Sequence, residues 1–106
     1  MEFIETKIFT EDITKLLDDD SYRELQEFLC ANPEAGDLIQ GTGGLRKIRW
    51  SAKGHGKRGG LRSIYYHHLC KETIYMFVAY PKNVKDNLSA SEKKYLKILL
   101  GEFKNG

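Results

Sequence analysis

The sequence predicts an α+β fold in which a small antiparallel sheet is preceded by helices and followed by a C-terminal helix. Two runs, residues 61–69 and 73–80, are rich in β-branched and aromatic residues and are joined by a short polar segment. Segments whose apolar residues recur at helical spacing come before and after these runs. A chain of 106 residues is close to the commonest domain size, so residues 1–106 are expected to form one domain.

The N-terminal third is expected to hold one strand and two helices. Residues 2–9 are rich in strand-forming residues and predict an opening strand, and the apolar spacing of residues 11–19 predicts a short helix. Ser21 and Glu24 match a capping box, in which two side chains satisfy backbone N–H groups at a helix start. A second helix should therefore begin at Ser21, and Pro33 should end it. Its apolar stripe, expected in the core, consists of Tyr22, Leu25, Phe28 and Leu29.

The sheet itself should be a three-stranded meander. Residues 34–44 contain four glycines and predict a loop, which leads to a strand at residues 45–51 and then to the two long strands. A second capping box, Ser89 with Glu92, predicts the C-terminal helix. We expect the helices to cover one face of the sheet and to leave the other face for function. The apolar stripe of the C-terminal helix consists of Leu96, Leu99, Leu100 and Phe103.

The charge of the chain is unevenly distributed. Residues 46–62 contain seven of the seventeen Lys and Arg residues and no acid, whereas the rest of the chain holds ten bases and all fifteen acids. A stretch of +7 inside a body of −5 indicates an anionic partner. The alternative is a solvated hairpin loop, but ordinary surfaces mix both signs of charge.

Other site classes fit the sequence poorly. Gly54, Gly56 and Gly59 match the dinucleotide-binding spacing, but a strand rather than a helix follows them. Cys30 and Cys70 are expected to be reduced, packed thiols, and no metal or other cofactor is expected. The sequence has no signal-peptide pattern and no apolar run of about 18 residues, so we expect a cytoplasmic protein that does not enter a membrane.

The basic stretch is typical of a nucleic-acid site. Its glycines allow the backbone to approach phosphates, and its Lys and Arg side chains supply positive charge. Aromatic residues near these bases favour single-stranded RNA, whose unstacked bases can lie on aromatic rings. The candidate stacking residues are Trp50, His55, Tyr65 and Tyr80.

Three segments carry a resemblance to a known family. They are Gly43-Gly-Leu-Arg-Lys-Ile-Arg, Gly56-Lys-Arg-Gly-Gly-Leu-Arg-Ser-Ile-Tyr-Tyr and Tyr80-Pro-Lys-Asn. Together with the order of the elements, they resemble the RelE superfamily of bacterial toxins, and within it the HigB-type branch. The resemblance implies a RelE-like microbial ribonuclease fold and a toxin that enters the ribosomal A site and cuts messenger RNA. It also implies a neighbouring antitoxin, expected to be a helix-turn-helix protein through which alone the toxin would contact DNA.

The same resemblance assigns site residues. The paired basic residues of the family correspond to Lys47 and Arg49, its next arginine to Arg62, and its basic residue after the last strand to Lys82. The arginine that often follows is replaced by Asn83, and the tyrosine that acts as a base in the best-known member has no clear equivalent here. The residues expected to bind RNA or ribosome are Arg46, Lys47, Arg49 and Asn83.

Metal-independent RNA cleavage needs a base for the 2′-hydroxyl, cations for the charge that develops on phosphorus and an acid for the leaving 5′-oxygen. Arg62 is expected to stabilise that charge, with Lys57 or Arg58 beside it. Lys53 or Lys57, surrounded by cations, or His55 would transfer the proton. The alternative is a protein that binds RNA or ribosome and blocks translation by occupancy alone.

Overall fold

The protein is described by a computed structural model that covers residues 1–51, 60–85 and 87–105. In these ranges three helices and a five-stranded sheet form the α+β fold that the sequence predicts. The elements, in chain order, are β1 (Glu2–Glu5), α1 (Lys7–Leu16), α2 (Asp19–Ala31), β2 (Asp37–Leu38), β3 (Arg46–Ser51), β4 (Gly60–His68), β5 (Thr73–Pro81) and α3 (Ala90–Asn105).

The predicted antiparallel meander is confirmed as the centre of the sheet. The strand order is β1-β5-β4-β3-β2, and β4 is antiparallel to both of its neighbours, β3 and β5. The opening strand predicted in residues 2–9 is present as β1, but its parallel pairing with β5 was not predicted. The two-residue strand β2, which pairs with β3, was not predicted either. The first strand therefore lies beside the last strand, and the helices that follow β1 cover the sheet.

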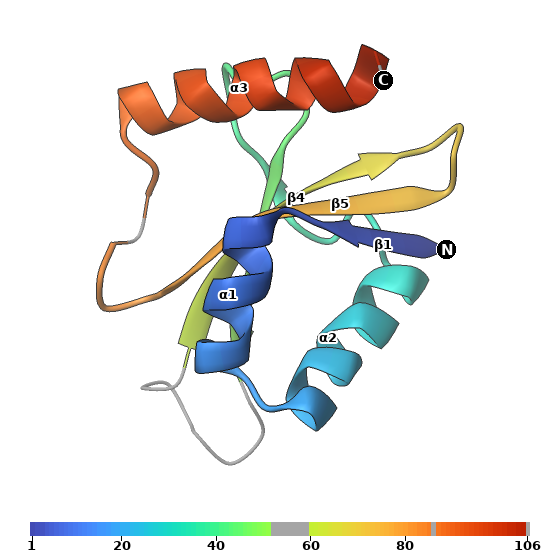
Figure 1. The fold of residues 1–106 in the computed structure, drawn as a ribbon, viewed down its shortest axis with the longest axis vertical. Coiled ribbons are helices and arrows are strands. Elements are labelled where there is room, and N and C mark those ends of the chain that lie inside the picture. Colours follow the sequence, from blue (N-terminus) through green and yellow to red (C-terminus); the bar gives the residue numbers. More distant parts are fainter. Residues whose placement is uncertain (52–59, 86, 106) are drawn as a thin grey trace.

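The helices cover both faces of the sheet, with α1 and α2 on one side and α3 on the other (Figure 1). Phe9 and Leu25 pack into a cluster with Leu61 on the first face, and Leu96 packs with Ile64 on the second. The expectation of a single covered face is therefore wrong. Both faces are covered because β4 and β5 are apolar and buried along most of their length, which is typical of strands packed on both sides.

The N-terminal boundaries differ from those predicted because of two helix caps. The side-chain oxygen of Thr6 accepts a hydrogen bond of 3.1 Å from the backbone N–H of Phe9, so α1 begins at Lys7 and the opening strand ends at Glu5. Asp18 accepts a bond of 2.7 Å from Ser21 N–H, which places Ser21 inside the first turn of α2 rather than at its cap.

Other helix predictions are confirmed. Helix α2 ends with Asn32 as its C-cap, immediately before Pro33. At the start of α3, Ser89 N–H donates to Glu92 Oε1 at 2.9 Å and Glu92 N–H donates to Ser89 Oγ at 3.2 Å, as the capping box predicts. Both apolar stripes supply buried residues, although Phe28 is partly exposed and packs on Trp50. Among the described helices, none is long and apolar enough to cross a membrane.

Candidate functional site

Two arginines lie directly opposite each other on adjacent strands of the meander. Arg49 on β3 is the register partner of Arg62 on β4, and Arg62 is the partner of Tyr80 on β5. Their neighbours Ile48 and Leu61 pack against α1 and α2, so alternation along the strands points both arginines to the α3 face. Like charges directly opposite one another destabilise a sheet. This arginine pair, Arg49 with Arg62, therefore concentrates positive charge on the α3 face of the sheet.

The two members of the arginine pair differ in exposure. Arg49 is exposed, whereas Arg62 is 6% exposed and is held on the rigid central part of the sheet. The guanidinium of Arg62 approaches the Leu61 carbonyl oxygen at 3.5 Å. A cation fixed in a poorly hydrated position acts more strongly on a nearby charge than one surrounded by water.

Lys47 lies on the same face as the arginine pair, as the spacing of two residues predicts. Its Nζ donates to Asn87 Oδ1 at 2.8 Å, which links β3 to the segment before α3. Arg46 points to the opposite face, where its Nη1 donates to the carbonyl oxygens of Glu34 at 3.1 Å and Gly36 at 2.8 Å. The structure therefore brings Lys47, but not Arg46, together with the arginine pair.

Lys82 and Asn83 form an exposed turn directly after β5. The backbone N–H of Lys82 donates to the carbonyl of Gly60 at 3.1 Å, so this turn lies beside the first residue of β4. Residues 52–59 join the sheet at the same end, between β3 and β4. The predicted site residues Lys53, His55, Lys57 and Arg58 fall in this segment and lie outside the described residues.

The comparisons with known proteins support one family. A family model described as the RelE toxin of the RelE / RelB toxin-antitoxin system matches residues 7–105. The chain belongs to the RelE toxin family. A solved structure of an E. coli RelE mutant toxin in the free state covers 92% of this chain and 93% of its own, with a TM-score of 0.58 and 16% identity. That likeness confirms the RelE fold.

As a member of the RelE family, the protein is the toxin of a toxin-antitoxin system, and a cognate antitoxin is implied. The structural relative is too distant in sequence to transfer any residue's role. Assignment to the HigB-type branch, like the roles given to individual site residues, stays a prediction.

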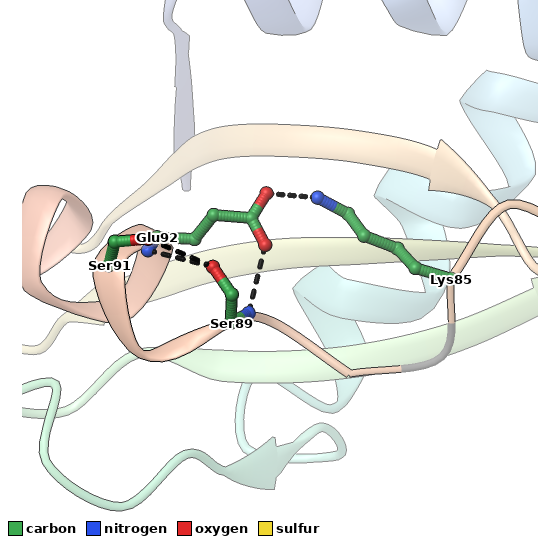
Figure 2. Close-up of polar contacts among 4 residues, drawn as sticks. All are labelled: Lys85, Ser89, Ser91 and Glu92. Carbon is green, nitrogen blue, oxygen red and sulfur yellow. Dashed lines mark hydrogen bonds and ion pairs between the residues drawn. The ribbon is translucent and has the colours of Figure 1, made fainter.

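Lys85 is a cation of this RelE toxin that sequence reasoning missed. Its Nζ lies 4.9 Å from the centroid of the Tyr80 ring, and it forms an ion pair with Glu92 at the start of α3 (Figure 2). The hydrogen bond from Lys85, followed by that from Ser89 N–H, lowers the pKa of Glu92. The sequence signal was a lysine shortly before a capping box. The capping glutamate uses one carboxylate oxygen for the helix cap, so its second oxygen can accept a hydrogen bond from that lysine.

Three of the four aromatic residues proposed for base stacking lie within the described residues and have other partners in the toxin. Tyr65 is fully buried, and its hydroxyl accepts from Gly36 N–H and donates to the Pro33 carbonyl, both at 2.9 Å. Burial raises the pKa of Tyr65. Trp50 is half-buried against Phe28, and Tyr80 is 7% exposed. The expectation that Tyr65 stacks on bases is wrong, because strand aromatics enclosed by helices on both faces belong to the core.

The predicted free thiols are confirmed in one respect only. Cys30 and Cys70 are unbridged, but both are exposed rather than packed. Cys30 lies in the last turn of α2, and Cys70 lies in the turn between β4 and β5. Within the described ranges, no cluster of three or more His, Cys, Asp or Glu residues is placed to hold a metal ion.

A second surface feature of the toxin is a groove of about 870 Å³ between α1, β5 and α3. Apolar side chains from all three elements line much of it, including Ile8, Val78 and Leu99. Lys85, Glu92 and Tyr80 also line the groove.

Proposed function

We propose that this toxin is an endoribonuclease that enters the ribosomal A site and cuts messenger RNA during translation. The observation that carries the proposal is the arginine pair, whose members lie opposite each other on the adjacent strands β3 and β4. In the sequence, the basic segment 52–59 connects these two strands. Family membership supports it, since the toxin must inhibit some process that its antitoxin holds in check.

The proposed reaction is a transfer within the RNA. The 2′-oxygen loses its proton and attacks the adjacent phosphorus, and the bond from phosphorus to the 5′-oxygen breaks as that oxygen gains a proton. Negative charge develops on the phosphate oxygens during attack. Arg62 would stabilise this charge, because its planar guanidinium can donate to two oxygens and its strand position is fixed before the substrate arrives. Arg49, exposed beside it, would hold the RNA backbone.

The remaining site residues are assigned as follows. Lys47 and Asn83 are proposed to bind RNA or ribosome. The RNA-binding role predicted for Arg46 would require its bonds to the carbonyls of Glu34 and Gly36 to break, so we propose instead that Arg46 serves the packed face of the sheet. Lys82 is assigned to the catalytic group because it adjoins Gly60. Proton transfer is assigned to Lys53, Lys57 or His55.

The proposed partners are messenger RNA, the ribosome and the cognate antitoxin, for which we propose a helix-turn-helix DNA-binding protein. DNA would then be contacted only through the complex with the antitoxin. Because ribosomes and messenger RNA are its targets, the proposed location is the cytoplasm.

The proposal is tested by inducing the toxin in cells and mapping messenger RNA 5′ ends by primer extension. New 5′ ends within codons are expected from the wild-type toxin, and Arg62→Ala should abolish them and relieve growth arrest. Arg62→Lys is the matched variant, which keeps a positive charge but loses the planar fork. Growth arrest without new 5′ ends would contradict cleavage and favour a blocker that acts by occupancy.

A further inference from the structure

Lys85 and Arg62 both neighbour Tyr80. Its ammonium is 4.9 Å from the centroid of the Tyr80 ring, and Tyr80 is the register partner of Arg62. Directly opposed residues on neighbouring antiparallel strands have Cβ atoms about 4.5–5.5 Å apart. Tyr80 packs with residues of α3, so its ring lies on the same face as the arginine pair. Lys85 therefore contacts the residue that lies directly opposite Arg62 in the sheet.

Glu92 holds this cation in place. One carboxylate oxygen accepts from Lys85 Nζ, while the other accepts from Ser89 N–H at 2.9 Å as part of the helix cap (Figure 2). The side chains of Lys85 and Glu92 are 33% and 40% exposed, so solvent and solutes can reach the ion pair. Ion pairs with this exposure are weak, and a phosphate group can compete with the carboxylate.

We propose that Lys85 is a further phosphate-binding residue of the RNA site, and that Glu92 controls its availability by competing with RNA for its ammonium group. The inference rests on the proposed function, because it requires an RNA backbone at the arginine pair. Lysine suits this exchange, since its ammonium on a flexible stem can turn from one oxygen ligand to another. In the free toxin the Lys85 ammonium is paired with Glu92, and with RNA bound it would contact a phosphate instead.

The chain offers substitutions that isolate this ion pair. Glu92→Gln removes the negative charge but retains an oxygen that can accept from Ser89 N–H, because glutamine serves in capping boxes as glutamate does. Lys85→Gln removes the cation while keeping a side chain of similar length. Glu102→Gln is the matched control, since Glu102 is an exposed acid near the other end of the same helix.

The experiment measures RNA affinity for the full-length wild-type toxin, the three single variants and the double variant Glu92→Gln with Lys85→Gln. The probe is a fluorescein-labelled single-stranded oligonucleotide with 2′-O-methyl groups, which lacks the attacking hydroxyl and stays intact. Fluorescence anisotropy is recorded over a range of salt concentrations. Glu92→Gln should tighten binding severalfold and steepen the plot of log affinity against log salt by about 0.7, the value for one added phosphate contact on a single strand.

In the Lys85→Gln background, Glu92→Gln should change the affinity less than twofold, and Glu102→Gln should likewise have little effect. Equal tightening with and without Lys85 would mean that Glu92 acts only through long-range charge, and would overturn the inference. Absence of saturable binding by both the wild-type toxin and Glu92→Gln would overturn it as well. Primer extension on the same variants separates the two proposals. If Glu92→Gln tightens RNA binding only when Lys85 is present but the toxin produces no new 5′ ends, only the nuclease assignment is wrong. If the toxin cleaves messenger RNA but the effect of Glu92→Gln does not depend on Lys85, only the role of Lys85 is wrong.

Discussion

The two faces of β3 show how one short strand serves both the core and the proposed site. On one face, Ile48 is buried and Trp50 packs on Phe28 of α2. On the other face, Lys47 and Arg49 carry positive charge beside the second buried core. Alternation of side chains separates the two roles within six residues. Substitutions on one face should therefore change stability, and those on the other should change activity.

The largest expected effect is on activity, from the charged face of the sheet. Arg62→Ala should lower the rate of RNA cleavage by about 10²–10³-fold, the usual result of removing one group that stabilises a developing anion. Primer extension with programmed ribosomes measures the rate, and thermal melting checks the fold. A rate within threefold of the wild type would contradict the role assigned to Arg62.

The largest expected effect on stability comes from the packed face. Ile48→Ala removes a buried side chain next to Leu61 and should lower the free energy of unfolding by about 2–4 kcal/mol. Urea denaturation followed by circular dichroism measures the change. Arg49→Gln, one residue along on the exposed side, is the matched control and should change stability by less than about 0.5 kcal/mol. Equal losses from both variants would refute the division between the faces.

A smaller effect is expected where a charged residue lies on the packed side. Arg46→Gln removes the hydrogen bonds to the Glu34 and Gly36 carbonyls and should lower the free energy of unfolding by about 1–2 kcal/mol. Cleavage per folded molecule should stay close to that of the wild type. The comparison uses Lys47→Gln, for which we expect weaker ribosome binding at unchanged stability. If Arg46→Gln impaired cleavage more than stability, the RNA-binding assignment of Arg46 would gain support.

The smallest effect concerns pH. Burial, followed by the hydrogen bond to Glu5, raises the pKa of Tyr22, whose hydroxyl donates to Glu5 Oε2 at 2.5 Å. The neutral tyrosine is thus favoured in the folded state, so its contribution is complete below the unfolded pKa of about 10 and is lost as the pH rises above it. Tyr22→Phe should lower stability by about 1 kcal/mol at pH 7 and flatten the alkaline decline. Urea titrations between pH 7 and 11 test this, and an unchanged slope would contradict it.

Sequence reasoning succeeded where local chemistry decides structure. The meander was predictable because its two long strands are rich in β-branched and aromatic residues, and the cap of α3 because Ser89 and Glu92 have the required spacing. It failed where two local patterns competed. Thr6 begins a helix within a run that alternates like a strand, and Asp18 caps α2 ahead of the box formed by Ser21 and Glu24.

For the candidate site, the sequence alone determined the basic stretch, the spacing of Lys47 and Arg49, and the resemblance to RelE toxins. Only the tertiary structure decided which cations lie near one another. Strand register sets Arg49 opposite Arg62, and a fold that brings the N-terminus of α3 beside β5 gives Lys85 both Tyr80 and Glu92 as partners. Spacing along a chain fixes which face a residue takes, but contacts between distant segments depend on how the elements pack.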